Sequence, residues 1–221
     1  MVEAPGASAI KWRKAIRIVA ARFPAVDLWA GLPEGLWERL DQVEAMTNPR
    51  LNRGVSAPSS FIQWPFSNPR PGRFSTESLG AFYAAHGEAA AIHETVHYQA
   101  IRCREDRLEP HDFDMRVLAA RIEGSFQDVR GGLARPFPGI MDPDSHRASR
   151  RLAEDLARAG SRGILFDSVR DPARGACVAA FTPSVVLACG HLRYLTYRWT
   201  GAGVVVAYEK LAYPTPGARP R

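Results

Sequence analysis

Cysteine, lysine and uninterrupted apolar stretches are all scarce in this chain of 221 residues. The three cysteines, Cys103, Cys177 and Cys189, are too few and too scattered for a disulfide framework or a paired-cysteine zinc site. The most apolar stretch, 178–192, is interrupted by polar residues and a proline, so it falls short of the roughly 18 apolar residues that span a membrane. No basic segment followed by an apolar run opens the chain, so no secretory signal is visible. We therefore expect a cytoplasmic protein that does not enter a membrane.

The positive charge of the chain comes almost wholly from arginine. Its 29 basic and 23 acidic residues give a net charge of +6, and only three of the basic residues are lysines. A basic balance would suit a nucleic-acid-binding module, which we keep as an alternative function. No basic helix, aromatic–basic ladder or zinc-finger spacing accompanies the charge, so direct nucleic-acid binding is not expected. Arginine does, however, grip phosphate and carboxylate groups with a fork of donors that lysine lacks.

Hydrophobic periodicity predicts one α+β domain with helices early, strands late and no βαβ alternation. Helices are predicted at 33–48, 86–104 and 144–159. Strands or extended segments are predicted around Ile16 and at 61–66, 79–85, 113–122, 125–129, 163–166, 176–181, 185–189, 192–199 and 204–212. The domain core is expected to span about 16–205, followed by a frayed tail at 213–221.

The sharpest local pattern is the pentapeptide 93–97, which matches HExxH. On a helix this spacing places two imidazoles on one face, where they would bind zinc while Glu94 activates a water. The extended motif is absent, because Ala100 and Cys103 stand where a glycine and a third histidine belong. Glu123 is a distant candidate for the third ligand. A zinc-dependent hydrolase built on His93 and His97 therefore stays an alternative, while our main hypothesis expects no metal.

A second series of short motifs runs through the chain in a fixed order. It comprises GRFS at 72–75, FYAA at 82–85, AAIHETVH at 90–97 and SVR at 168–170. In this order the motifs resemble those of the RES-domain family, which is named for its Arg, Glu and Ser. Two further stretches, 22–28 and 47–50, look like a branch of that family with longer chains. The resemblance extends from about Ile16 to Trp199.

The resemblance implies an NAD⁺-consuming toxin of a type II toxin–antitoxin system. It implies a fold similar to that of ADP-ribosyltransferases, with mixed or antiparallel sheets and flanking helices. NAD⁺ would be the substrate, nicotinamide would be released, and ADP-ribose would pass to a protein, to phosphate or to water, among which the residues do not decide. An Xre-type antitoxin would block the NAD⁺ site, so the resemblance also implies a hetero-oligomer.

By the same resemblance, individual positions of this chain match the family's functional residues. Four of them are assigned to catalysis: Arg73, Tyr83, Glu94 and Ser168. Arg17, on the first expected strand, resembles an early arginine of the same site. Ser75 stands where many members have Asn, and it is assigned to NAD⁺ binding together with Arg17 and Arg170. Ile92 stands where arginine-targeting transferases carry a second glutamate, which argues against arginine as the acceptor.

The chemistry of these residue types suits the implied reaction. Nicotinamide departs neutral from a cationic precursor, so its loss needs no general acid, and the carboxylate of Glu94 would stabilise the positive charge that develops on the ribose. Arg73 and Arg17 would hold the pyrophosphate through paired N–H donors.

The remaining assigned side chains would hold the nicotinamide end of the substrate. Tyr83 offers a flat face and a hydroxyl, and Ser168 would hydrogen-bond the nicotinamide amide or the ribose. Arg170 would hold a nearby carboxylate or phosphate. Three other arginines, Arg147, Arg150 and Arg151, are expected on the solvated face of the second long helix.

Overall fold

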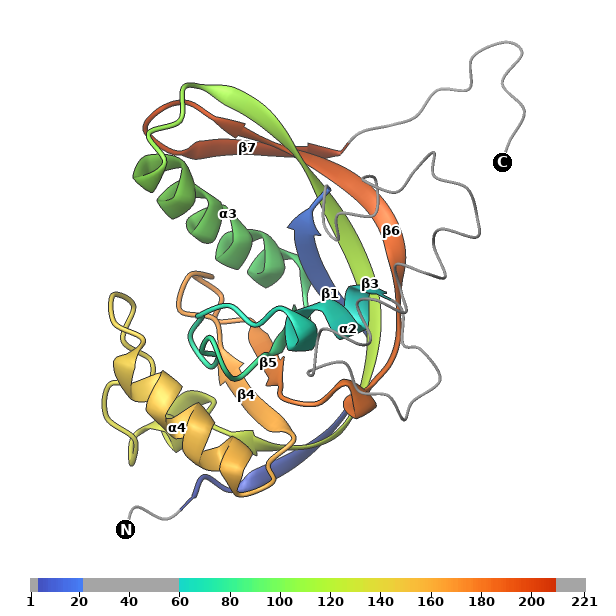
Figure 1. Ribbon diagram of the computed structural model, residues 1–221, viewed down its shortest axis with the longest axis vertical. Helices are drawn as coiled ribbons and strands as arrows, with labels where there is room; N and C mark the ends of the chain where they lie inside the picture. The colour runs from blue at the N-terminus through green and yellow to red at the C-terminus, as the bar shows by residue number, and fades with distance from the viewer. Residues whose placement is uncertain (1–3, 22–59, 210–221) are drawn as a thin grey trace, which may run out of the picture.

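The computed structural model describes residues 4–21 and 60–209 (Figure 1). The strands are β1 (Ala7–Ala20), β2 (Phe82–Ala85), β3 (His111–Asp128), β4 (Gly163–Asp167), β5 (Ala176–Ala180), β6 (Val186–Trp199) and β7 (Val204–Glu209). The helices are α2 (Ser60–Ser67), α3 (Glu88–Glu105) and α4 (Arg147–Arg158), with short 3₁₀ turns η2 (Gly131–Ala134) and η3 (Pro183–Val185). Four stretches discussed above lie outside the described residues: 22–28, the helix predicted at 33–48, 47–50 and the tail at 213–221.

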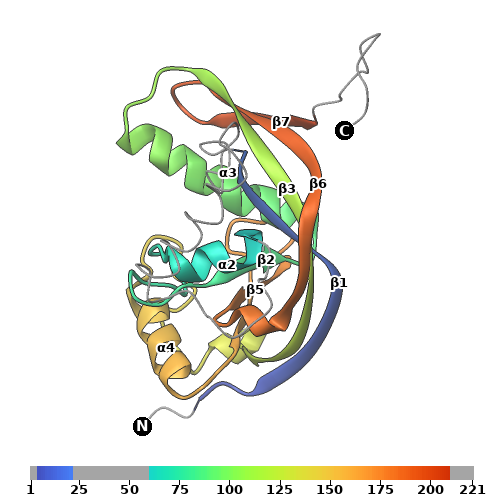
Figure 2. The same ribbon diagram turned by 45° about the vertical axis from the view of Figure 1, so that its right-hand side comes forward.

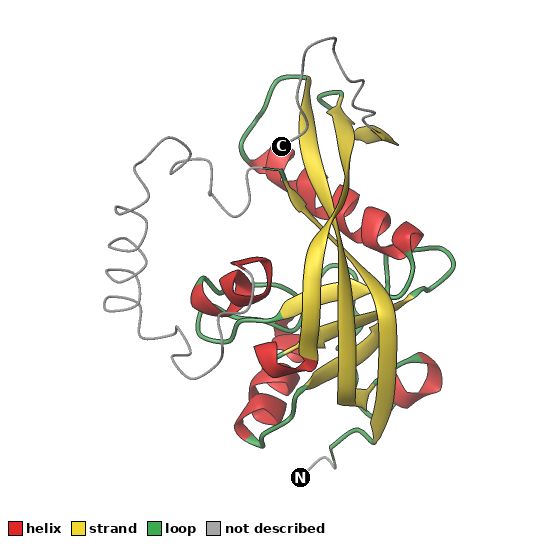
Figure 3. Ribbon diagram, turned by 90° about the vertical axis from the view of Figure 1, so that its right-hand side faces the viewer, coloured by secondary structure: helices red, strands yellow, loops and turns green. Residues whose placement is uncertain are grey.

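The strands form one mixed sheet in the order β1-β2-β5-β4-β3-β6-β7, and β1 also pairs with β3. These pairings close β1, β2, β5, β4 and β3 into a ring, while β6 and β7 continue the sheet beyond β3. Seen from the side away from α3, the long strands β1, β3 and β6 lie next to one another (Figure 3). The predicted α+β class, with a mixed sheet and flanking helices, is confirmed.

One connection of the sheet differs from the prediction. β3 and β4 pair in parallel through Gln127 opposite Ile164 and Asp128 opposite Leu165, and the chain between them crosses over through α4. Parallel neighbours need such a crossover because a tight hairpin joins only antiparallel strands. The expectation of no βαβ alternation is therefore wrong for this unit, since the periodicity of a segment does not report the direction in which its strand pairs.

The strand predicted at 61–66 is also wrong, because these residues belong to the helix α2, which has Pro65 inside it. A short apolar run does not by itself distinguish a strand from a buried helix. The helix brings Ile62 and Phe66, one turn apart, onto the same apolar cluster. Tertiary packing thus decides the conformation of this segment.

The two later helices and most of the other strands occur near their predicted positions, but β1 begins at Ala7, nine residues before Ile16, where the first strand was expected to open. Residues 210–212 of the strand predicted at 204–212 lie outside the described residues. Two expected breaks between strands are absent. These are the breaks between 113–122 and 125–129, now continuous in β3, and between 185–189 and 192–199, now continuous in β6. The glycines at the two breaks stay inside the sheet, with Gly124 opposite Ile10 and Gly190 opposite Ala119. Because the neighbouring strands are long and pair on both sides of each glycine, β3 and β6 remain continuous at these positions.

Two apolar clusters lie on the two faces of the sheet, because successive strand residues point to opposite faces. On β4, Ile164 and Phe166 belong to the first cluster and Leu165 to the second, and all three are buried. The first cluster also includes residues of α3 and α4, and the second includes Ile62 of α2. The helices α3 and α4 therefore cover one apolar face of the sheet, and α2 covers the other.

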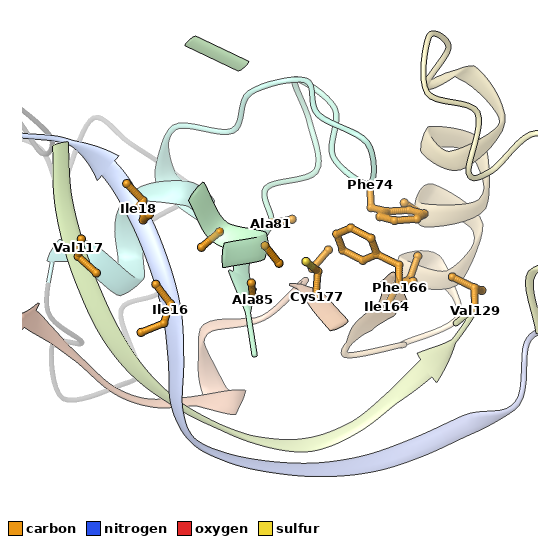
Figure 4. Packing of buried hydrophobic residues seen from close by; sticks show 14 of the residues in the cluster. Ile16, Ile18, Phe74, Ala81, Ala85, Val117, Val129, Ile164, Phe166 and Cys177 are labelled. Atoms are coloured by element: carbon orange, nitrogen blue, oxygen red, sulfur yellow. The ribbon is translucent and has the colours of Figure 1, made fainter. Parts of the chain in front are cut away.

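The loop between α2 and β2 is anchored in the first cluster. Phe74 is fully buried, and its ring lies 5.0 Å from that of Phe166, centroid to centroid. Figure 4 shows the two rings together, in line with Cys177 and with Ala85 at the end of β2. Burial of Phe74 fixes the position of the residue before it, Arg73.

Helix α3 packs against the concave side of the bent sheet (Figures 1 and 2). Its buried positions are small: Ala90, Ala91, Ala100 and Cys103. They allow the helix to approach the strands closely, and a hydrogen bond of 2.8 Å between the hydroxyls of Thr95 and Tyr197 ties its middle to β6. No helix within the described ranges is long and apolar enough to cross a membrane.

Candidate active site

A single cavity of about 710 Å³ gathers most of the candidate residues, and we call it the central cavity. Six of the seven line it: Arg17, Arg73, Ser75, Tyr83, Glu94 and Arg170. Ser168 is fully buried and reaches the cavity only through Glu94. In the part of the chain that the structure describes, five arginines and two acidic residues line the wall, so the central cavity is electropositive.

Glu94 and Ser168 are joined by a hydrogen bond of 2.6 Å from the serine hydroxyl to Oε1. Two backbone N–H groups donate to the same hydroxyl oxygen, from Arg170 at 3.2 Å and from Asp171 at 3.0 Å. Because a hydroxyl has one proton and both N–H groups point at its oxygen, that proton is directed to the carboxylate. The turn after β4 thus holds Glu94 in one orientation on the wall of the cavity.

The residue before Glu94 ties α3 to the same turn. His93 Nδ1 lies 3.1 Å from Oδ1 of the buried Asp171. Burial acts to raise the pKa of Asp171, but hydrogen bonds from the N–H groups of Ala173 and Gly175 and from His93 outweigh it, so the pKa lies below its ordinary value. Two successive residues of α3 therefore bind the turn that carries Ser168.

The same contact separates the two histidines of the HExxH pentapeptide. His97 lines the central cavity, whereas His93 turns to Asp171 and is not among the described lining residues. Glu123, the distant candidate ligand, pairs with Lys11 at 3.2 Å. Among residues 4–21 and 60–209, no group of three or more His, Cys, Asp and Glu side chains is arranged to hold a metal ion.

Arg73 is a buried cation on the wall of the cavity, with 7% of its surface exposed. Its Nη1 donates to the backbone carbonyls of Ile140 at 3.2 Å and Asp142 at 2.8 Å. Burial lowers the pKa of Arg73, and the nearby carboxylate of Glu94 opposes that shift. Within the described chain, Nη2 and Nε have no protein partner, so they are the donors available to a ligand.

The hydroxyl of Tyr83 is committed to the loop that carries Arg73. It accepts a hydrogen bond of 2.8 Å from the N–H of Phe74 and donates to Ser75 Oγ at 3.1 Å, while Ser75 donates to the carbonyl of Arg70 at 2.7 Å. Burial raises the pKa of Tyr83 to about 12, so the phenol stays neutral. Tyr83 still lines the cavity, but its hydroxyl makes its hydrogen bonds to the loop.

Gly72 is required by this arrangement. A Cβ atom at this position would lie 2.8 Å from Ser75 Oγ and 2.9 Å from Tyr83 Oη, closer than real side chains approach. Its carbonyl accepts a hydrogen bond of 2.8 Å from Nε of Arg150 on α4. Arg150 therefore has a specific partner in the loop instead of lying wholly on a solvated helix face.

The side chain of Arg17 binds the neighbouring strand β2. Its Nη1 donates to the carbonyl of Tyr83 at 2.9 Å, and its guanidinium lies 4.7 Å from the centre of the Phe82 ring. Burial lowers its pKa to about 10, so it remains charged at neutral pH. Arg17 is half-buried and is among the residues that line the central cavity. Its guanidinium lies against Phe82, which belongs to the second cluster, whereas Tyr83 packs on the first.

Positive groups gather where the loop before α4 meets α3. Arg170 Nη2 donates to the carbonyl of Pro143, beside the carbonyls that Arg73 binds. Burial, together with Arg73, Arg150 and Arg170, lowers the pKa of His146 to about 4. Sequence reasoning missed His146 and the contact of Arg150, because no local motif marks residues that meet the site only through folding.

Three comparisons show which known proteins the chain is similar to. The model of a family described as "RES domain" matches residues 47–200. The chain is 24% identical over 206 residues to the uncharacterized protein y4oC of Sinorhizobium fredii, an alignment that covers 87% of this chain and 85% of that protein. Its structure is similar to a chain in the crystal structure of the M. tuberculosis MbcT–MbcA toxin–antitoxin complex, with a TM-score of 0.47, 10% identity and 88% of each chain covered.

Proposed function

The chain belongs to the RES domain family, and on that basis we propose that it is a toxin that cleaves the nicotinamide–ribose bond of NAD⁺ and transfers ADP-ribose to an acceptor. The enzyme would be an ADP-ribosyltransferase, an NAD⁺ glycohydrolase or a phosphorylase, according to whether the acceptor is a protein, water or phosphate. NAD⁺ serves as substrate, and the proposal needs no metal.

The observation that carries the proposal is the carboxylate of Glu94, held by the hydroxyl of Ser168 at 2.6 Å on the wall of an electropositive cavity. A carboxylate whose orientation is set before the substrate binds stabilises positive charge without first having to reorganise. Such a group suits a reaction in which the ribose becomes cationic while the leaving group loses its charge.

The reaction balances with the residues present. The bond between the nicotinamide nitrogen and ribose C1′ breaks, and both its electrons leave with nicotinamide, which departs neutral. The acceptor forms a bond to C1′ and gives up its proton. Glu94 stabilises the ribose cation through the carboxylate that accepts the hydrogen bond of the Ser168 hydroxyl.

The size and charge of the central cavity suit a dinucleotide. Its volume of about 710 Å³ lies within the range of roughly 300–1,000 Å³ typical of small-molecule sites. Nη2 and Nε of Arg73, which make no hydrogen bond within the described ranges, suit the pyrophosphate. The face of the Tyr83 ring is the flat surface for nicotinamide, whereas its hydroxyl holds the loop around Gly72.

The proposal includes a protein partner. An enzyme that consumes NAD⁺ harms the cell that makes it, so an inhibitor is needed, and the RES resemblance implies an Xre-type antitoxin. The arginines of the cavity wall would attract a carboxylate side chain or a chain terminus of that partner. The expected assembly is a hetero-complex in which the antitoxin and NAD⁺ compete for one site.

Release of nicotinamide from NAD⁺ by the purified chain, freed of any partner, tests the proposal directly. Wild-type protein is expected to release nicotinamide, and Glu94→Gln, which keeps the size and removes the charge, is expected to lose at least about 100-fold in rate. Mass spectrometry of the products with and without phosphate and cell extract identifies the acceptor. Equal rates for wild type and Glu94→Gln would contradict the assigned role of Glu94.

A further inference from the structure

The loop that carries Arg73 is held from two sides. On one side the Tyr83 hydroxyl and Ser75 fill the space beside Gly72, and on the other Nε of Arg150 donates to the Gly72 carbonyl at 2.8 Å. Arg150 belongs to α4, which lies far along the chain from the loop, and it is half-buried. No motif of the family resemblance includes Arg150.

We propose that Arg150 is a positioning residue that sets the guanidinium of Arg73 toward the substrate. The proposal rests on the proposed function, because it assigns a role in binding NAD⁺. Arg150 is not among the described residues that line the central cavity, so it acts through the loop and not by touching substrate. Its contact falls on the peptide bond that joins Gly72 to Arg73, and so holds the backbone of that residue, whereas Ile140 and Asp142 hold its guanidinium.

The contacts of Arg73 explain why its loop needs this second support. Nη1 donates to the carbonyls of Ile140 and Asp142, whereas Nη2 and Nε make no hydrogen bond to a described residue and are the donors left for a ligand. A small rotation of the peptide bond before Arg73 would turn those donors away while the buried Phe74 held the far side of the loop in place. A charged donor on the Gly72 carbonyl opposes that rotation, because hydrogen bonds to charged groups are the stronger ones.

Neighbouring arginines on the same helix supply matched controls. Arg147 and Arg151 are exposed, whereas Arg150 is half-buried against the loop. Substitution of Arg151 removes the same charge from the same helix without touching Gly72. Arg150→Met and Arg151→Met each remove one positive charge from α4, and of the two only Arg150→Met removes the hydrogen bond to the Gly72 carbonyl. Arg150 is also one of the charges that lower the pKa of His146, so the charge-keeping variant Arg150→Lys separates that effect from loss of the contact.

Steady-state kinetics with NAD⁺ give the first test. Arg150→Met is expected to raise KM by about 10-fold or more with kcat within about 3-fold, because Arg73 holds substrate and transition state alike. Arg150→Lys, whose ammonium can still donate to the Gly72 carbonyl, is expected to recover most of the loss, and Arg151→Met is expected to stay within about 2-fold of wild type. If Arg150→Met matched Arg151→Met, the proposal would be overturned.

A double-mutant cycle separates positioning from a general loss of stability. In an Arg73→Gln background, Arg150→Met is expected to raise KM by less than about 2-fold, because the residue through which it acts is already gone. A full additional effect in that background would contradict the proposal. Thermal unfolding of each variant shows whether the protein is folded under the assay conditions.

Hydrogen exchange distinguishes failure of this inference from failure of the proposed function. Arg150→Met is expected to speed amide exchange in the peptide spanning 70–76, which includes the Phe74 N–H bonded to Tyr83, and Arg151→Met is not. If wild type released no nicotinamide, the proposed function would fail while exchange still reported on the loop. Unchanged exchange in Arg150→Met would overturn the positioning role whatever the activity.

Discussion

Glu94 and Ser168 stand 74 residues apart in the chain, and yet the serine hydroxyl donates a hydrogen bond of 2.6 Å to the glutamate carboxylate. Two backbone N–H groups that donate to the same oxygen leave the hydroxyl no other orientation. The contact joins the middle of α3 to the turn after β4. It makes Ser168 a support of the carboxylate in the free protein, while the sequence had suggested a direct contact with substrate.

Ser168→Ala is expected to lower nicotinamide release by about 10- to 100-fold, because Glu94 loses the donor that orients it. It is also expected to reduce the free energy of unfolding by about 1–3 kcal/mol, since two backbone N–H groups lose their acceptor. Activity assays and urea unfolding measure the two effects, with the exposed Ser184→Ala as control. Full activity in folded Ser168→Ala would show that the serine does not support the reaction.

Gly72→Ala is expected to destabilise the protein by about 1–3 kcal/mol and to weaken NAD⁺ binding, because the added Cβ meets Ser75 Oγ and Tyr83 Oη at less than 3 Å. Gly190→Ala is the matched control, since nothing lies within 4 Å of the Cβ that it would add. Chemical unfolding and substrate titration give both values. If Gly72→Ala and Gly190→Ala had the same free energy of unfolding, the loop would accommodate the added Cβ atom without destabilising the protein.

His146 is expected to make the folded protein less stable in acid. Its pKa is about 4 in the fold against an ordinary value of 6.5, so its stabilising contribution is complete above pH 6.5 and is lost as the pH falls toward 4. The loss is expected to be about 1–2 kcal/mol, because the side chain is half-buried and its charges are partly screened.

Urea unfolding between pH 7 and pH 4 measures this contribution. His146→Gln is expected to lose less stability than wild type as the pH falls from 7 to 4, with substitution of the exposed His191 by Gln as the control. His97, whose pKa is also lowered by burial, acts in the same direction and is present in both variants. If the free energy of unfolding fell equally with pH in wild type and His146→Gln, the prediction would be contradicted.

Removal of metal is expected to leave NAD⁺ cleavage unchanged. His93 is engaged by Asp171 while His97 faces the cavity, so the two imidazoles of the HExxH pentapeptide do not converge on one ion. Activity after dialysis against a chelator, together with metal analysis, checks this. Stoichiometric zinc that disappears with activity in His97→Ala would support the zinc hydrolase instead.

Expression of the wild-type chain alone in a bacterial host is expected to arrest growth, because the cell loses NAD⁺ or its proteins are modified. Co-expression of the neighbouring antitoxin gene, or the substitution Glu94→Gln, is expected to restore growth. Colony counts and cellular NAD⁺ levels measure the effect. Healthy growth with abundant, folded wild-type protein and no partner would contradict the toxin hypothesis.

Much of the local structure was readable from the sequence. The helix at 86–104 follows from its alanine content, and the helix at 144–159 follows from apolar spacing and the stop signal of Gly160; α3 and α4 occupy those positions. The prediction at 61–66 was wrong because a short apolar run fits either conformation, and packing of Ile62 and Phe66 selects the helix. Breaks expected within β3 and β6 are absent because long neighbouring strands pair across them.

The sequence by itself determined the short apolar strands, the two later helices and the ordered motifs that indicated the family and the candidate residues. These are local properties, set by the period of the backbone and by residue chemistry. Only the tertiary structure decided that β3 and β4 run parallel, that Ser168 meets Glu94 and that Arg150 meets Gly72. Those contacts join residues distant in the chain, and their formation depends on the closed arrangement of strands and helices, which no single segment encodes.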